Sequence, residues 1–100
     1  YEDTSMGNPA AYAASKGGLL ALTRWLATVI APNVRINMIT LGGVFRNQPE
    51  TFIARYNERT PLNRMATEAD VKGAALYLAS DLSQYVTGQN LIVDGGWSAW

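Results

Sequence analysis

The spacing of apolar and polar residues along this chain predicts a helix, a strand, two further helices and a second strand. The first helix is expected over residues 9–31, and its second half is apolar around much of its circumference. Its first half consists mostly of small residues and includes two successive glycines, Gly17 and Gly18, each costing about 1 kcal/mol of helix stability relative to alanine. This pattern predicts a helix that is buried on more than one side and that a ligand or another backbone approaches closely.

The rest of the chain alternates short strands and helices. The expected positions are a strand over 34–41, helices over 50–59 and 68–80, and a strand over 89–93. Thr67 and Asp70 form a near match to a capping box at the start of the third helix. The apolar side chains that this helix should bury are Val71, Ala74, Ala75, Leu78 and Ala79. A mostly apolar strand that directly follows a helix is typical of a buried parallel sheet, so the expected fold class is α/β.

Composition and charge narrow the possible functions. Eight basic and eight acidic residues cancel among 100 residues, so no basic patch indicates nucleic-acid binding. Cysteine and histidine are absent, so we expect no disulfide, no thiolate chemistry and no metal site. Acid–base chemistry would have to use Tyr, Lys, Asp or Glu. No apolar run approaches the roughly 18 residues of a membrane span, and the polar N-terminus is unlike a signal peptide. We therefore expect a cytoplasmic protein without a membrane partner.

One pair of side chains near the start of the first helix has the spacing of an acid–base site. Tyr12 and Lys16 are four residues apart, which places their Cβ atoms about 5–6 Å from each other on one helix face. An ammonium group at that distance favours phenolate and lowers the tyrosine pKa from its usual value of about 10. Such a tyrosine can act as a general acid or base. The alternative is an ordinary Tyr/Lys pair on a wet helix face, because this spacing also recurs by chance.

Several longer motifs, in their order along the chain, resemble the C-terminal part of a classical short-chain dehydrogenase/reductase. They are Tyr12–Lys16, Arg35–Val44, Pro61–Met65, Leu78–Asp81 and Tyr85–Trp97. The resemblance covers essentially the whole chain. Residues 47–50 and 93–100 are also similar to members of this family from bacterial sugar and flagellin-modification pathways. The fold implied is a Rossmann-type doubly wound parallel sheet, of which residues 1–100 would be the C-terminal portion of a single domain.

The resemblance also implies an activity and a site. The parent protein would be an NAD- or NADP-dependent oxidoreductase that interconverts an alcohol and a ketone on a small-molecule substrate. Tyr12 would transfer the proton, and Lys16 would tune Tyr12 and hydrogen-bond the nicotinamide ribose. The cofactor-binding residues would be Tyr12, Lys16, Gly42, Gly43 and Val44. The Val44 backbone would be the partner of the nicotinamide carboxamide.

Other residues keep a plain structural interpretation beside the functional one. Gly42 and Gly43 could simply form a tight turn. The resemblance implies that Asn37 is structural and supports that turn. Tyr85 and Trp97, as aromatic residues near a sheet edge, fit a core or an interface better than a substrate contact.

This chain also departs from the family pattern. Leu41 stands where the family usually has proline. Without the fixed φ of proline, the turn would be looser. The glycine-rich phosphate loop, the residue that selects NAD or NADP, and the catalytic serine would all precede Tyr1. Ser5 and Ser15 lie too close to Tyr12 to replace that serine. The chain is therefore expected to lack the dinucleotide-binding half of its domain and to be incomplete alone.

Two hypotheses about function follow. In the first, the chain is part of an active oxidoreductase, as the complete Tyr12/Lys16 pair suggests. In the second, it is a catalytically silent fragment that acts as an oligomerising structural module, as the missing cofactor loop suggests. Under both we expect a homo-oligomer, because the first helix carries more apolar surface than the other elements can cover.

Overall fold

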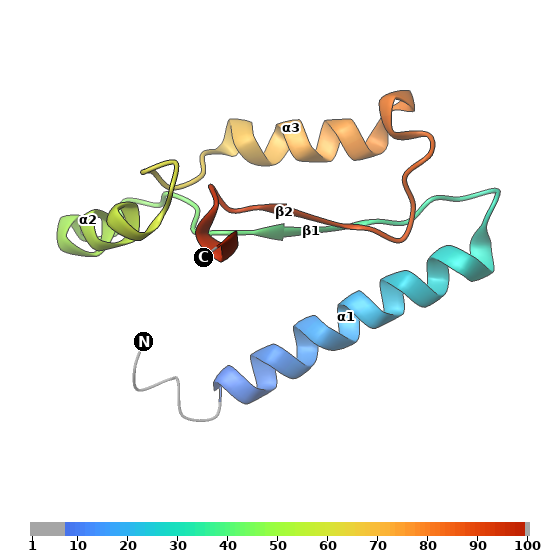
Figure 1. The fold of residues 1–100 in the computed structure, drawn as a ribbon, viewed down its shortest axis with the longest axis horizontal. Coiled ribbons are helices and arrows are strands. Elements are labelled where there is room, and N and C mark those ends of the chain that lie inside the picture. Colours follow the sequence, from blue (N-terminus) through green and yellow to red (C-terminus); the bar gives the residue numbers. More distant parts are fainter. Residues whose placement is uncertain (1–7, 100) are drawn as a thin grey trace. The chain divides into compact units, whose positions relative to one another are not determined.

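The computed structural model describes residues 8–99 and shows the predicted order of helix, strand, helix, helix and strand (Figure 1). The elements are α1 (Asn8–Ile30), β1 (Met38–Leu41), α2 (Glu50–Arg59), α3 (Glu68–Ala79), the 3₁₀ turn η1 (Asp81–Ser83), β2 (Asn90–Val93) and the 3₁₀ turn η2 (Trp97–Ala99). Two compact units divide the chain: residues up to Met38 with Thr87–Gln89, and Ile39–Val86 with the residues from Asn90 onwards.

The two strands pair in parallel, as predicted. The Met38 N–H donates to the Gln89 carbonyl at 2.8 Å, and four residues further on the Gly42 N–H donates to the Val93 carbonyl at 2.9 Å. Equal steps along both strands are the mark of a parallel pair. The sheet confirms an α/β fold built around parallel strands.

The first strand is shorter than predicted, because the segment that would pair with residues 34–37 is not extended. Gly88, which lies opposite, has φ of +73°, and its N–H donates to the Ile36 carbonyl at 2.7 Å. The Thr87 hydroxyl accepts the Ile36 N–H at 3.1 Å. A side chain and a left-handed glycine thus replace the regular ladder at this end, and the strand begins at Met38.

Helix α3 lies along the two strands (Figure 1). The Thr67 N–H donates to the Asp70 carboxylate at 2.7 Å, which confirms the predicted interaction at the helix start. The predicted buried stripe is partly wrong. Its members Val71, Ala74 and Leu78 are half-buried, whereas its two other alanines are exposed. The buried side of α3 within this unit is therefore a narrow stripe.

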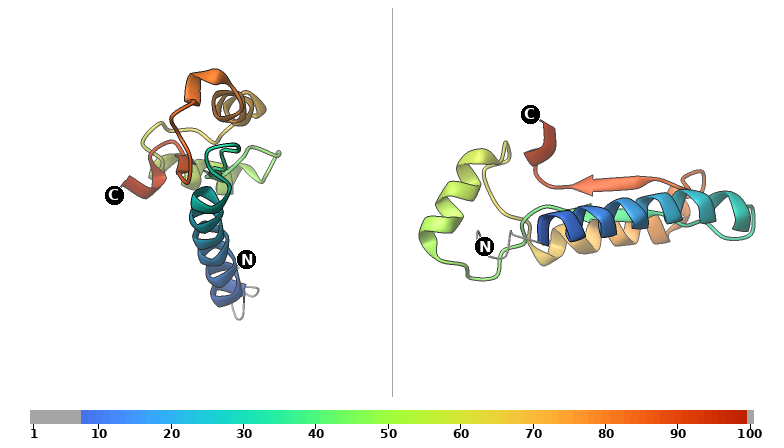
Figure 2. Two further views of the ribbon diagram at one scale, coloured as in Figure 1. Left: turned by 90° about the vertical axis from the view of Figure 1, so that its right-hand side faces the viewer. Right: turned by 90° about the horizontal axis from the view of Figure 1, so that it is seen from below.

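Helix α2 runs across the strand direction beyond the carboxyl end of β1 (Figure 2). Its C-terminus is fixed by Thr60, whose side chain is 3% exposed. The Thr60 N–H donates to the Asn57 carbonyl at 3.2 Å, and its hydroxyl donates to the Tyr56 carbonyl at 2.7 Å. Pro61 follows directly and cannot continue the helix. Local sequence therefore determines where α2 ends.

Helix α1 matches its predicted length to within one residue at each end, but it is not buried on several sides. Thr23 and Ala27 are buried, whereas Leu22, Trp25 and Val29 are each about half exposed or more. Added Cβ atoms at its two glycines would meet nothing within 4 Å among the described residues. None of the helices within residues 8–99 combines the length and apolar character needed to cross a membrane.

Candidate functional site

The structure brings the predicted acid–base pair together at the start of α1. The Lys16 Nζ atom lies 5.4 Å from the centroid of the Tyr12 ring. Tyr12 is 64% exposed and Lys16 is half-buried, so the phenol is open to solvent. Ser15, between them in sequence, is exposed, and Ser5 lies outside the described residues. The predicted proximity is thus observed, while the catalytic roles of the two residues stay a prediction.

Gly42 and Gly43 are required by close packing rather than by an unusual backbone angle. Neither has a positive φ. A Cβ on Gly42 would lie 2.9 Å from the Asp94 Cα and Cβ atoms, and a Cβ on Gly43 would lie 2.6 Å from the Tyr56 Cζ atom. Any side chain at either position would therefore displace its neighbours. The simple tight-turn alternative does not account for these contacts.

Hydrogen bonds hold this turn on both sides. The Gly43 N–H donates to the Tyr56 hydroxyl, and the Gly43 carbonyl accepts the Ala66 N–H at 2.8 Å. The Phe45 N–H donates to the Ala66 carbonyl at 2.9 Å, which places Val44 in a parallel bridge with Ala66. These hydrogen bonds hold the turn in place, although Leu41 precedes it instead of proline.

The Val44 backbone keeps one hydrogen-bond donor that its neighbours in the turn do not. Its carbonyl accepts from the Gln48 side-chain amide at 3.0 Å, and the other end of that amide accepts the Arg46 N–H at 2.8 Å. The Val44 N–H donates to no protein acceptor within residues 8–99. The turn therefore presents one backbone donor, beside a carbonyl that already binds a primary amide.

Comparison with known proteins assigns the family. The family profile described as enoyl-(acyl carrier protein) reductase matches residues 2–98. The flagellin modification protein A of Campylobacter coli is 37% identical over 98 residues, which are 97% of this chain and 38% of that protein. The 3-oxoacyl-(acyl-carrier-protein) reductase FabG of Chlamydia pneumoniae is 41% identical over 90 residues, covering 85% of this chain and 36% of the reductase.

A solved structure agrees with the sequence matches. The short-chain dehydrogenase of Leptospira borgpetersenii, crystallised with bound NAD⁺, superposes with a TM-score of 0.81 at 46% identity, covering 87% of this chain and 35% of that one. The chain belongs to the short-chain dehydrogenase/reductase family. The predicted family, its Rossmann-type fold and the likeness to flagellin-modification relatives are confirmed. The chain spans little more than a third of the length of these relatives.

Three residues singled out in the short-chain dehydrogenase/reductase motifs have structural surroundings that refine the predictions. Asn37 accepts the Gln89 N–H on its side-chain oxygen at 3.0 Å, so it supports the start of the strand pair and not the glycine turn. Trp97 stacks on Tyr56, with centroids 4.6 Å apart and planes at 18°, which fits the structural interpretation. Tyr85 is fully exposed, so a core role is excluded for it within this structure.

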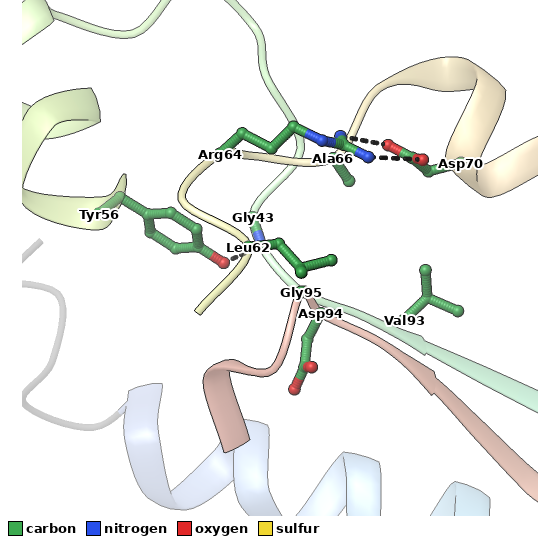
Figure 3. A pocket seen from close by; sticks show the side chains of 9 residues that line it. All are labelled: Gly43, Tyr56, Leu62, Arg64, Ala66, Asp70, Val93, Asp94 and Gly95. Carbon is green, nitrogen blue, oxygen red and sulfur yellow. Dashed lines mark hydrogen bonds and ion pairs between the residues drawn. The ribbon is translucent and has the colours of Figure 1, made fainter. Parts of the chain in front are cut away.

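A pocket of about 70 Å³ beside the glycine turn contains residues that sequence analysis did not select (Figure 3). Gly43, Tyr56 and Leu62 line it, together with Arg64 and Asp94. The carboxylate of Asp94 is held by hydrogen bonds from the Ser98 side chain and from backbone N–H groups, which keep its pKa below the usual value. The spacing of Phe52 and Tyr56, four residues apart on α2, places both rings on one helix face and could have predicted an aromatic cluster here.

Within the described residues, no group of three or more His, Cys, Asp or Glu side chains could hold a metal ion. The groups that the sequence predicts for the chemistry are the phenol of Tyr12, the ammonium of Lys16 and the backbone of the turn at Gly42–Val44. The first two lie in one unit and the turn in the other.

Proposed function

We propose that this chain is part of an NAD(P)-dependent oxidoreductase that interconverts an alcohol and a ketone, with Tyr12 as the proton donor and acceptor. The observation that carries the proposal is the position of the Lys16 ammonium, 5.4 Å from the centroid of an exposed Tyr12 ring. In a chain without histidine, a tyrosine beside a fixed cation is a suitable acid–base group. Membership of the short-chain dehydrogenase/reductase family supports it.

We also propose that residues 1–100 correspond to the C-terminal part of one Rossmann-fold domain. The relatives are much longer than this chain, and the motifs found here follow the family order from the Tyr12–Lys16 pair onwards. The dinucleotide-binding half would then lie in the part of the relatives that the chain does not cover. Residues that select NAD or NADP would lie there too.

The surroundings of the glycine turn fit a nicotinamide carboxamide. The Val44 N–H makes no hydrogen bond within residues 8–99 and can donate to the carboxamide oxygen. The Val44 carbonyl accepts from the primary amide of Gln48, which is the same chemical group as the nicotinamide amide. The space beside Gly42 and Gly43 where a side chain would lie is filled by Asp94 and Tyr56, so the Val44 backbone is the part of the turn left to contact the ligand. The unused Val44 N–H supports the assignment of Val44 to cofactor binding, and the family motif is the support for Gly42 and Gly43.

The chain's own residues would perform the proton transfer. During reduction the Tyr12 hydroxyl donates its proton to the substrate oxygen as that oxygen gains negative charge, and during oxidation the phenolate takes the proton back. The Lys16 ammonium stabilises the negative charge on Tyr12 between these events. When bound, the nicotinamide supplies or accepts the hydride.

Replacing Tyr12 in the full-length protein tests the proposal. Tyr12→Phe keeps the ring and removes the proton, so we expect kcat to fall by about 10²- to 10⁴-fold on small ketones or sugar alcohols that the wild type turns over. NADH or NADPH binding, followed by nucleotide fluorescence, should weaken by at most about 10-fold, the size of one hydrogen bond, because the ring is kept. Tyr77→Phe, on α3, is the matched control and should keep wild-type activity. Full activity of Tyr12→Phe would rule out Tyr12 as the acid–base group.

A homo-oligomer is part of the same proposal. Leu19, Leu22, Trp25 and Val29 of α1 are each 48–60% exposed, and exposed apolar patches commonly mark interfaces. These side chains also support the alternative that the 100-residue chain alone is a catalytically silent oligomerising module. Light scattering at micromolar concentration should give a multiple of the chain mass. Titration of the 100-residue chain with NADH distinguishes a cofactor-binding oligomer from a silent module. Saturable binding is expected only if the oligomer forms a cofactor site.

A further inference from the structure

Tyr56 of α2 contacts the glycine turn directly. Its hydroxyl accepts the Gly43 N–H, and its ring lies where a side chain on Gly43 would otherwise be (Figure 3). The Met65 Cε atom lies on the same side, 2.9 Å from a Cβ built on Gly43, and Met65 is buried. The peptide between Gly42 and Gly43 is thus held by a side chain from a separate helix.

Tyr56 is itself held from two directions. The Trp97 ring stacks on it at a centroid distance of 4.6 Å, within the range of favourable aromatic pairs. The Tyr56 carbonyl accepts the hydroxyl of the buried Thr60 at 2.7 Å. Side chain and backbone of Tyr56 are both fixed, so its hydroxyl has a defined position relative to the turn.

Trp97 is in turn positioned by the segment that follows β2. The Asp94 carboxylate accepts the Gly96 N–H at 2.9 Å and the Ser98 N–H at 3.1 Å, on either side of Trp97. The Gly95 carbonyl accepts the Leu62 N–H at 3.0 Å, which ties this segment to the linker after α2. A continuous set of contacts therefore joins Asp94, Trp97, Tyr56 and the glycine turn.

We propose that Tyr56 is a positioning residue for the cofactor-binding turn. This inference rests on the proposed function, in which the Val44 backbone binds the nicotinamide carboxamide. The N–H of Gly43 is committed to Tyr56, and the Gly43 carbonyl to Ala66, which leaves the Val44 N–H as the donor next along the chain. The Ala66 N–H, bonded to the Gly43 carbonyl, orients the peptide that carries the Val44 N–H, and the Tyr56 hydroxyl holds the peptide before it. Together the two bonds fix the direction in which the Val44 backbone is presented. Tyr56 acts through the turn and not on the substrate.

The test uses the full-length protein and whichever of NADH and NADPH the wild type binds more tightly. Tyr56→Phe removes the hydroxyl and keeps the ring, so folding should be retained. We expect the dissociation constant of the nucleotide, and its KM, to rise by about 2- to 10-fold, the size of one hydrogen bond, while the KM of the substrate stays the same. Tyr85→Phe is the matched control, because that side chain is fully exposed, and it should leave both constants unchanged.

Trp97→Leu is a second variant that frees Tyr56 without touching the turn, and it should raise the nucleotide dissociation constant in the same direction. A lower Tm for Tyr56→Phe with wild-type nucleotide affinity would overturn the inference, because it would show a merely structural role. Unchanged affinity in both variants would overturn it as well. The proposed function is tested separately, by the activity of Tyr12→Phe. Even if that variant were fully active, the effect of Tyr56→Phe on nucleotide binding could still be measured.

Discussion

The guanidinium of Arg64 holds the carboxylate of Asp70 through two hydrogen bonds, of 2.8 Å and 3.1 Å. Arg64 lies in the linker before α3, and Asp70 lies in the first turn of that helix. The same carboxylate accepts the Thr67 N–H at 2.7 Å, and Arg64 also donates to the Met65 carbonyl at 3.0 Å. Two parallel bonds of this kind fix geometry as well as charge, so the linker has a defined path into α3.

This ion pair predicts a dependence of stability on pH. The hydrogen bonds from Arg64 hold the pKa of Asp70 far below its usual value of 3.8, and the Thr67 N–H adds to the effect. Because the unfolded chain binds the proton more readily, the contribution of Asp70 to the free energy of unfolding is present above about pH 4 and is lost as the pH falls below that. We expect Asp70→Asn to lower the Tm of the full-length protein at pH 6 by at most about 4 °C. Circular dichroism melts between pH 6 and pH 2.5 should show this difference shrinking.

Glu68→Gln is the control for that series. Glu68 shares the first turn of α3 with Asp70 but forms no ion pair within the described residues. Its Tm difference from wild type should vary less with pH than that of Asp70→Asn. An Asp70→Asn difference that stays constant down to pH 2.5 would contradict the assigned role of the carboxylate.

The segment after β2 provides a second stability prediction. Asp94→Ala removes the acceptor for the Gly96 and Ser98 N–H groups, so we expect a loss of roughly 1–2 kcal/mol in the free energy of unfolding. Urea unfolding of the full-length protein measures it. Asp81→Ala, in η1, is the control and should stay within about 0.5 kcal/mol of wild type. Equal midpoints for the two variants would show that Asp94 does not fix this segment.

The elements that sequence predicted best are those with local start and stop signals. Helix α2 begins after Pro49 and ends before Thr60-Pro61, and its predicted bounds are those observed. The strand predicted over 34–41 is too long, because its length depends on Gly88 and Thr87, which lie about fifty residues further along the chain. The sequence of residues 34–41 alone cannot predict where the segment that pairs with them stops being extended.

The same distinction applies to the candidate site. The Tyr12/Lys16 pair could be predicted because helical spacing alone brings the two side chains together. The contact of Tyr56 with Gly43 could not, since it depends on how α2 is turned relative to the strands. The sequence predicts a turn at that glycine, whereas the structure shows that it makes room for an aromatic ring.

Lys16 provides a prediction about catalysis. Lys16→Met removes the cation beside Tyr12, so we expect kcat of the full-length protein to fall by about 100-fold or more. Lys16→Arg keeps the charge but replaces a compact ammonium with a planar group, so its kcat should lie between those of Lys16→Met and wild type. Steady-state kinetics measure both, with Lys72→Met on α3 as the control for loss of a surface cation. Equal activity of the Met and Arg variants would show that charge at this position is not what matters.

Gly43→Ala tests the close packing at the turn. The new methyl group would lie 2.6 Å from the Tyr56 Cζ atom and 2.9 Å from the Met65 Cε atom, so one of these side chains must move. We expect the free energy of unfolding of the full-length protein to fall by about 1–3 kcal/mol, as in other overpacked sites. Gly73→Ala on α3 is the matched control, because its Cβ would meet nothing within 4 Å among the described residues, and it should be neutral or stabilising by up to about 1 kcal/mol. If Gly43→Ala unfolds at the same urea concentration as wild type, the Tyr56 ring is free to shift, and the turn is not fixed by α2.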